Sequence, residues 1–459
     1  MNIYFWWNSF IEIETKSYTL VCDPWVNEII PGYGWKPCNN YHIRTVIDLL
    51  LRADCLYISH IHYDHLDIEL LSLALRMRDN QLTLIIPKLN NNHLINKIRS
   101  LNCPKLNIIE LAPYQTMNLC NTLIVQMIPQ FSESSSQISG IGYEMDSSIM
   151  VHSVDTGKTF LNSVDNPLSP SDYKSVISHV CFNPIDLLSI PASSASEYPQ
   201  SYLGINRSLE AQRVTENLFQ NTKSILDIVK PINFIQAGGS YSVSSVLTSL
   251  EEYKVMLNET QLDELALITA TNHVNLNLCE YVSFSNDGLI IATLPDEFRS
   301  LGSLYLQVNS ISIDLYDNTN NIYSIARLND DFQTASEKFF SLVKKNLDLP
   351  VSLCNYEFYL YENIPKIDST GPFLLVTDEP MCCFLLSPSS QLTISSSVDC
   401  QQLTTSRKLT LHLSQLLFQN CIHRLTSWNT ALTSSSVLIE RFPNEFHLVD
   451  QQLLNFLCI

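Results

Sequence analysis

The chain has 459 residues, 45% of them hydrophobic, and a formal net charge of −19 at pH 7. Because a single hydrophobic core stops growing at roughly 250–300 residues, this length predicts more than one domain. The negative charge disfavours binding to nucleic acids and to anionic membranes, whose phosphates it repels, and it leaves a small molecule as the expected partner.

Cysteine usage and the N-terminal residues favour a cytoplasmic protein. The 13 cysteines form no C-x-x-C pair, which is typical of reduced thiols inside the cell. The first residues lack the basic region of a signal peptide. No run of about 18 uncharged apolar residues occurs, so no membrane-spanning helix is expected. The sequence leaves a homo-oligomer open.

Predicted strands and helices alternate through the first part of the chain. Apolar and acidic residues alternate with period two up to residue 14, which predicts a strand over residues 3–14. The elements that follow are a strand at 18–22, a short helix at 46–51, a strand at 55–59, a helix at 66–77 and a strand at 82–87. Such alternation is typical of an α/β layered domain.

The remainder divides into a continuation of this domain and a second, smaller one. Further strands are predicted at 122–128, 148–152, 159–162 and 232–236, and helices at 209–229 and 330–347. Short strand-like runs extend from 284 to about 328, and we place a boundary near 300–330. The sequence therefore predicts a domain over residues 1–300 and an accessory α+β domain over residues 325–459.

The chemistry is carried by residues 59–65, whose sequence fits the pattern H-x-H-x-D-H. His60, His62, Asp64 and His65 follow a buried strand and precede a helix, where a turning backbone can aim several side chains at one point. Imidazole and carboxylate donors together suit zinc, iron or manganese. We expect His60 and His62 to hold one ion, and Asp64 and His65 to contribute to a neighbouring ion. Asp64 could also cap the following helix, but a cap does not explain three histidines.

This motif after a strand resembles the metallo-β-lactamase superfamily over about residues 1–300. The resemblance implies a four-layer αββα sandwich that holds one or two divalent metal ions, with zinc favoured over iron and manganese. The sequences ASSASEYP at 192–199, QAGGS at 236–240 and RFPN at 441–444 are similar to a narrower branch. That branch contains proteins related to the CMP-N-acetylneuraminate hydroxylase catalytic region, with ascorbate-6-phosphate lactonase-like proteins as more distant relatives.

The resemblance also implies an aspartate that bridges two metal ions at the end of a later hairpin. Residues 155–165 look like that hairpin. We expect Asp165 to be the bridging ligand, because the strand-forming residues 160–163 lead into it. Asp155, in the sequence Asp-Thr-Gly, is the competing candidate.

Two histidines that two-metal members of the superfamily usually have are missing from their expected places. The predicted strand at 122–128 leads to Gln130, where a histidine would be expected, and Gly238 stands near the place of another. His152 and His273 are the remaining candidates to complete the site. The other histidines are interpreted as structural or surface residues: His42, His93, His179, His412, His423 and His447.

Hydrolysis is the leading functional hypothesis, with a metal-activated water attacking an ester, lactone, amide or phosphodiester of a small molecule. Asp64 would act as general base if only one ion is bound. The branch resemblance implies an alternative, an iron-dependent oxygenase acting on a nucleotide sugar-like substrate. Cys421 and His423 form only half of a Rieske pattern, so an oxygenase would need a separate electron donor. A degenerate member that binds without catalysis is the third hypothesis.

Overall fold

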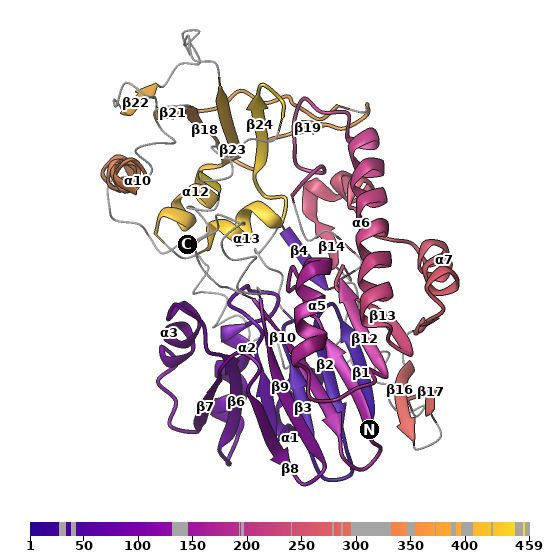
Figure 1. Cartoon of the computed structure of the whole chain (residues 1–459). Coiled ribbons are helices and arrows are strands. Elements are labelled where there is room, and N and C mark those ends of the chain that lie inside the picture. The colour runs from indigo at the N-terminus through magenta and orange to yellow at the C-terminus, as the bar shows by residue number, and fades with distance from the viewer. Residues whose placement is uncertain are drawn as a thin grey trace, which may run out of the picture.

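The computed structural model describes residues 1–26, 34–37, 43–130, 146–191, 193, 197–239, 241–277, 280–285, 288–294, 332–346, 354–371, 373–386, 392–395, 407–423, 426–445 and 453–454. The expected boundary at 300–330 lies outside these residues, as do His42 and His447. Most of the described strands gather in two large sheets and one smaller sheet (Figure 1).

The first sheet has eight strands in the order β17-β16-β1-β2-β3-β5-β6-β7. Their bounds are Asn2–Trp7 (β1), Phe10–Glu14 (β2), Thr19–Cys22 (β3), Cys55–Tyr57 (β5), Leu82–Pro87 (β6), Leu106–Leu111 (β7), Glu280–Ser285 (β16) and Gly288–Thr293 (β17). Strands β3, β5, β6 and β7 run parallel. The carboxyl ends of β3 and β5 therefore meet at one edge, where Asp23 and the histidine motif follow.

The second sheet has seven strands in the order β15-β13-β12-β11-β10-β9-β8. Their bounds are Thr116–Cys120 (β8), Leu123–Pro129 (β9), Ser147–Ser153 (β10), Lys158–Asn162 (β11), Leu187–Pro191 (β12), Asn233–Ala237 (β13) and Asn272–His273 (β15). Strands β8 to β11 pair antiparallel, and β11, β12, β13 and β15 pair parallel. A separate two-stranded ribbon pairs β4 (Gly34–Pro37) with β14 (Tyr241–Ser244).

Three hydrophobic clusters separate four layers. Side chains of both sheets, such as Ile13, Tyr57, Val125 and Phe160, fill the space between the sheets. Helices α1 (Ile43–Arg52), α2 (Ile68–Met77) and α3 (His93–Arg99) cover the outer face of the first sheet. Helices α5 (Pro170–His179), α6 (Arg207–Val229) and α7 (Glu259–Thr269) cover the outer face of the second. The expected four-layer αββα sandwich is confirmed.

Two local predictions near the site are wrong. The single strand predicted over residues 3–14 is two antiparallel strands, β1 and β2, because the chain turns at Asn8, where φ is 45°. Asparagine tolerates this left-handed conformation, so the turn needs no glycine. Helix α2 begins at Ile68 and not at Leu66, and Asp67 caps it by accepting from Leu70 N at 3.0 Å. Asp64 is therefore free of the capping role.

A smaller unit with both helices and strands follows. Its five-stranded sheet has the order β22-β21-β18-β23-β24, with bounds Asn355–Tyr361 (β18), Cys382–Leu386 (β21), Leu392–Ser395 (β22), Lys408–Ser414 (β23) and Leu438–Phe442 (β24). Its helices are α10 (Phe332–Asn346), α12 (Gln415–Ile422) and α13 (Trp428–Thr433). Phe340 of α10 packs against Phe358, Phe384 and Phe418, with ring centroids 5.1–6.1 Å apart.

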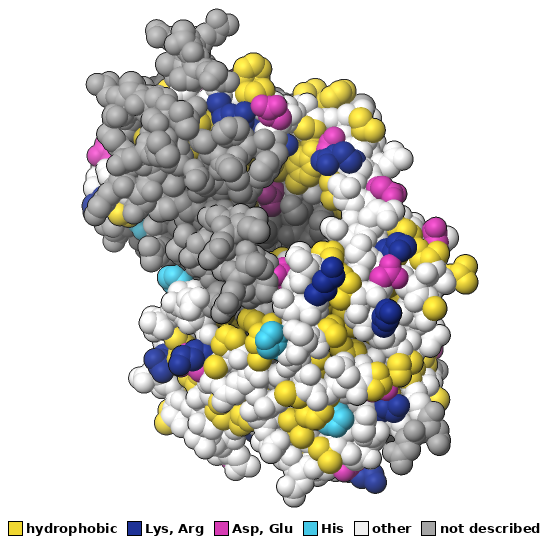
Figure 2. Space-filling view, viewed as in Figure 1, with side chains coloured by type: hydrophobic (Ala, Val, Ile, Leu, Met, Phe, Trp, Pro, Cys, Tyr) yellow, Lys and Arg dark blue, Asp and Glu magenta, His cyan; other side chains and the backbone are white. Residues whose placement is uncertain are grey.

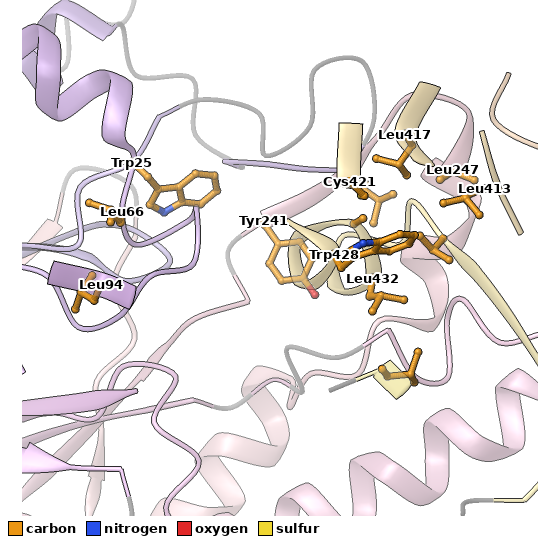
Figure 3. Packing of buried hydrophobic residues seen from close by; sticks show 14 of the residues in the cluster. Trp25, Leu66, Leu94, Tyr241, Leu247, Leu413, Leu417, Cys421, Trp428 and Leu432 are labelled. Carbon is orange, nitrogen blue, oxygen red and sulfur yellow. The ribbon is translucent and has the colours of Figure 1, made fainter. Parts of the chain in front are cut away.

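The two units share backbone hydrogen bonds and a hydrophobic cluster. Ile439 N of β24 donates to Ser201 O at 2.9 Å, and Leu203 N donates to Ile439 O at 2.8 Å. The same cluster contains Leu247 of the 3-10 helix η1 (Ser245–Tyr253) and Trp428 of α13, which Figure 3 shows together with other members. The packing is therefore continuous from one unit into the other.

No described helix combines the length and apolarity needed to cross a bilayer. On the face in Figure 2, the acidic and basic side chains of the described residues are interspersed and do not gather into one patch. The nine cysteines in the described part of the chain are free thiols.

Candidate metal centre

The histidine motif occupies the turn between β5 and α2, at the carboxyl edge of the first sheet. His60 and His65 are fully buried, and Asp64 is nearly so. The rings of His60 and His65 have centroids 3.9 Å apart. The turn is held by backbone bonds in which His65 N and Leu66 N donate to His62 O. The motif's side chains therefore converge and do not splay into solvent.

Asp23 and Ser59 fix how two of the imidazoles are presented. Ser59 Oγ donates its one proton to Asp23 Oδ2 at 2.7 Å, so it accepts from His60 Nδ1 at 2.8 Å. His60 therefore presents Nε2 as a lone pair. Asp23 also accepts from Ser59 N at 2.8 Å and from His65 Nδ1 at 3.1 Å, which leaves His65 Nε2 for the site. A carboxylate behind the ring is the usual partner of metal-binding histidines.

His60, His62 and Asp146 form a first group of candidate ligand atoms. His60 Nε2 lies 2.9 Å from His62 Nδ1 and 3.5 Å from Asp146 Oδ1. All three atoms lie within 4.8 Å of one another. Atoms bound to one tetrahedral ion at bond lengths of about 2.0–2.1 Å would be roughly 3.3 Å apart. The spacing of this group therefore fits a single ion.

Asp146 is the site residue that the sequence reasoning missed. It directly precedes β10, and the pairing of β10 with β9 sets Ser147 opposite Pro129. Gln130 Nε2 donates to Asp146 Oδ2 at 3.2 Å, and Asp146 N donates to Gln130 Oε1 at 3.1 Å. Ser147 Oγ donates to Ser59 O at 2.8 Å and ties the second sheet to the motif. Gln130, where a histidine would be expected, thus orients an aspartate.

His65, Asp165 and Asp64 form the second group. His65 Nε2 lies 3.0 Å from Asp165 Oδ2 and 3.5 Å from Asp64 Oδ2. A ring nitrogen of His60 also lies within 4.8 Å of the ligand atoms of His65 and Asp165. One ring nitrogen serves one ion, and His60 Nδ1 is already bonded to Ser59, so His60 can complete only one of the two groups.

The structure brings Asp165 to the site and leaves Asp155 away from it. Asp165 follows β11 after Val164, whose φ of 52° turns the chain towards the histidines. Asp155 is exposed in the turn between β10 and β11, at the other end of these strands. Bridging of two ions by Asp165 stays a prediction.

The three histidines of the site differ in the direction of their pKa shifts. Burial, followed by repulsion from His65, holds the pKa of His60 well below its usual range and lowers the pKa of His62 to about 4. Burial alone would lower the pKa of His65, but the carboxylates of Asp64 and Asp165 raise it well above its usual range. His60 and His62 are therefore neutral, and each can offer a nitrogen lone pair to a metal ion. Without an ion, His65 is a positively charged imidazolium among carboxylates.

The pKa values of the three carboxylates are shifted in different directions, although burial favours a rise in each. Burial raises the pKa of Asp146 to about 7, with Asp165 adding to the rise, and burial raises the pKa of Asp64 to about 6. Burial would also raise the pKa of Asp165, but the charge and hydrogen bond of His65 hold it below its usual range. A bound cation would offset the free-energy cost of burying these three carboxylates in their charged form.

One buried carboxylate oxygen in this site lacks a hydrogen-bond donor in the described part of the chain. Asp146 Oδ1 is buried and has no hydrogen-bond donor among the described residues. It lies 3.5 Å from His60 Nε2, which carries a lone pair. Two acceptors facing each other in a buried space are unfavourable unless something positive lies between them. The donor set and this orphaned oxygen both fit a divalent metal ion.

The other histidine candidates lie apart from both groups. His152 stacks on Phe182 with ring centroids 4.1 Å apart and is hydrogen bonded to Thr159 Oγ1 at 3.1 Å. His273 Nδ1 lies 2.8 Å from Asp263 Oδ1. Neither His152 nor His273 belongs to a group of candidate ligands among the described residues.

Comparison with known proteins gives structural neighbours only. No protein-family model matches this chain, and no curated protein sequence does. A similar solved structure is CmlA, a diiron β-hydroxylase from Streptomyces venezuelae, at 16% identity and a TM-score of 0.40 over 64% of this chain and 54% of CmlA. Another is isothiocyanate hydrolase from Delia radicum gut bacteria, at 12% identity and a TM-score of 0.41 over 62% of this chain and 100% of that one.

A third neighbour is Tm1679, a metal-dependent hydrolase of the β-lactamase superfamily, at 7% identity and a TM-score of 0.31 over 60% of this chain and 92% of that one. The match to CmlA spans about half of the length of CmlA, 54%. At identities of 7–16% and TM-scores of 0.31–0.41, these likenesses say nothing about the reaction of this chain.

Proposed function

We propose that this chain is a metal-dependent enzyme that binds two adjacent divalent ions and hydrolyses a small molecule. The proposal is carried by the convergence of three imidazoles and three carboxylates on one buried point. These side chains come from three segments far apart in sequence: residues 60–65, residue 146 and residue 165. A bound cation would supply the positive partner that the buried Asp146 Oδ1 lacks beside the lone pair of His60.

The two groups would each hold one ion. The first would be bound by His60, His62 and Asp146. The second would be bound by His65, Asp165 and Asp64, with Asp165 reaching towards both. When bound, the ions would polarise the scissile bond of an ester, lactone, amide or phosphodiester and lower the pKa of water.

Asp64 is the protein group best suited to move a proton. Asn8 Nδ2 donates to its Oδ2 at 3.3 Å, and Ser9 Oγ donates to its backbone oxygen at 3.3 Å, so its position is fixed. Burial raises its pKa to about 6, close to the pH at which a general base works best. If the second ion is absent, Asp64 would accept the proton of the attacking water.

An iron-dependent oxygenase is the second candidate, and one observation favours it. The first group of ligand atoms contains two imidazoles and one carboxylate, because Asp146 stands in for a histidine. This donor set occurs in non-haem iron oxygenases as well as in zinc hydrolases. Anionic ligands also stabilise the higher oxidation states of iron. Such an enzyme would draw electrons from a separate donor protein.

Elemental analysis of the purified chain decides between these functions. Two equivalents of zinc or manganese, with hydrolysis in a panel of esters, lactones, amides and phosphodiesters, would support the first. Iron together with oxygen uptake would support the second. A chain without stoichiometric metal after refolding with each ion would contradict both and leave a non-catalytic binding protein.

His62→Ala should abolish activity and remove about one equivalent of metal. The matched control is His152→Ala, which removes an imidazole that stacks on Phe182 outside the site. Retained activity and normal metal content in His62→Ala would refute the ligand assignment. Equal losses in both variants would point to unfolding and not to a ligand.

A further inference from the structure

The turn between β1 and β2 holds Asp64, one member of the second group. Asn8 is only 7% exposed although it lies in a turn, and its φ is 45°. Its Nδ2 donates to Asp64 Oδ2 at 3.3 Å, and the next residue, Ser9, donates from Oγ to Asp64 O at 3.3 Å. The strand prediction over residues 3–14 hid this turn, so Asn8 had no expected role.

The loop after β13 passes close to the side-chain oxygens of both Asn8 and Asp165. Gly238 N donates to Asn8 O at 3.4 Å, and the φ of Gly238 is 81°. A side-chain carbon added at Gly238 would lie 3.5 Å from Asp165 Oδ1, 3.7 Å from Asn8 Oδ1 and 3.9 Å from Ser193 Oγ. The missing side chain of Gly238 therefore leaves a small space bordered by three oxygens.

We propose that Asn8 Oδ1 is a further ligand of the second metal position. This inference rests on the proposed metal centre. Among the described residues, Asn8 Oδ1 has no hydrogen-bond donor, whereas Asn8 Nδ2 is committed to Asp64. A neutral amide oxygen is a ligand that divalent ions accept alongside carboxylates. It would supply the second position with the donor that the sequence lacks near residue 238, where no histidine is present.

Two substitutions separate ligation from mere positioning of Asp64. Asn8→Gly removes the amide, and glycine adopts the left-handed backbone without strain. Asn8→Asp keeps an oxygen in place of Oδ1 but loses the N–H donor and repels Asp64. Ligation predicts that Asn8→Gly weakens the second metal equivalent about 10–100-fold, as loss of a metal-site partner does. It also predicts that Asn8→Asp restores affinity to within about threefold of wild type.

The readout is stepwise titration with Co²⁺ against a chromophoric chelator, with the visible absorption of the second equivalent reporting its coordination. Asn102→Gly is the matched control, because Asn102 has φ 46° and is exposed. Unchanged second-site affinity and spectrum in Asn8→Gly would overturn the ligand assignment alone. Equal weakening in Asn8→Gly and Asn8→Asp would also overturn it, since Asn8 would then act only through Asp64. A wild-type chain that binds no Co²⁺ would overturn the proposed metal centre together with this inference.

Discussion

Replacing Asp23 by asparagine tests whether one buried carboxylate controls the affinity of both metal positions. Three donors point at this carboxylate: Ser59 N at Oδ1, and Ser59 Oγ and His65 Nδ1 at Oδ2. Asparagine keeps one acceptor atom and replaces the other by a donor. It therefore loses at least one of these bonds in either orientation of its amide. The left-handed φ of 45° at this position suits asparagine, so the backbone should remain in place.

Loss of a hydrogen bond to residue 23 should also change the hydrogen bond between Ser59 and His60. If the amide nitrogen takes the place of Oδ2, Ser59 Oγ must turn and donate elsewhere. Donation to His60 Nδ1 would move the ring proton to Nε2 and block metal binding. Loss of such a hydrogen-bonded partner typically costs 10–100-fold in metal affinity, or about 1.4–2.8 kcal/mol. We therefore expect Asp23→Asn to weaken both metal equivalents by about this factor.

Competition with a chelator of known affinity measures this effect, and Asp186→Asn is the matched control. Asp186 is a buried aspartate that accepts from Thr159 N at 2.9 Å and Lys158 Nζ at 3.0 Å, away from the site. Its variant should lose stability but keep normal metal affinity. The reasoning fails if Asp23→Asn binds metal as tightly as wild type, or if both variants lose affinity equally.

Three further outcomes follow from the site and its surroundings. Asp146→Asn should remove the first metal equivalent and leave the second, as counted by elemental analysis; two retained equivalents would contradict the first group. Because burial raises the pKa of Asp146 to about 7, an ion must displace its proton. Metal affinity should therefore rise by up to about tenfold per pH unit between pH 5 and 7, with proton release measurable by calorimetry in two buffers; a flat profile would contradict this. Burial raises the pKa of Glu12 to about 7 although Glu12 pairs with Arg52. The contribution of Glu12 to the free energy of unfolding should therefore fall by up to about 3 kcal/mol from pH 5 to 8. The difference in urea unfolding between wild type and Glu12→Gln at the two pH values checks this sign; a difference independent of pH would refute it.

The sign of the Glu12 effect comes from its raised pKa. The folded protein binds the proton more tightly than the unfolded chain does, so the stabilising contribution is complete below the ordinary pKa of glutamate. It is lost as the pH rises through about 7. Asp165 has the opposite shift, since its pKa is lowered by His65.

The local part of the site was predictable because its residues are close in sequence. His60, His62, Asp64 and His65 share one turn, and the strand before them could be recognised from its apolar run. Asp165 required a distant hairpin to be recognised, which the superfamily resemblance supplied. The four-layer sandwich was implied by the same resemblance, whereas the alternation of strands and helices by itself predicts only an α/β layered domain.

Asp146 was not predictable, because its place depends on strand register. It is separated from Gln130 by 16 residues, and only the pairing of β9 with β10 brings the two together. A one-residue change of register would reverse the direction of every side chain. An aspartate directly before a buried strand was the one available signal. The turn at Asn8 was hidden because asparagine there does the work that glycine usually does.

The shared cluster at the junction has a consequence for how the chain unfolds. Trp428 and Leu413 of the C-terminal unit lie in one cluster with Leu247 and Tyr241, which precede residue 300 (Figure 3). A chain cut near residue 300 would expose this apolar surface to water and should aggregate. The two units should melt in one cooperative transition, and exchanging the C-terminal unit for that of another protein would require redesign of both partners.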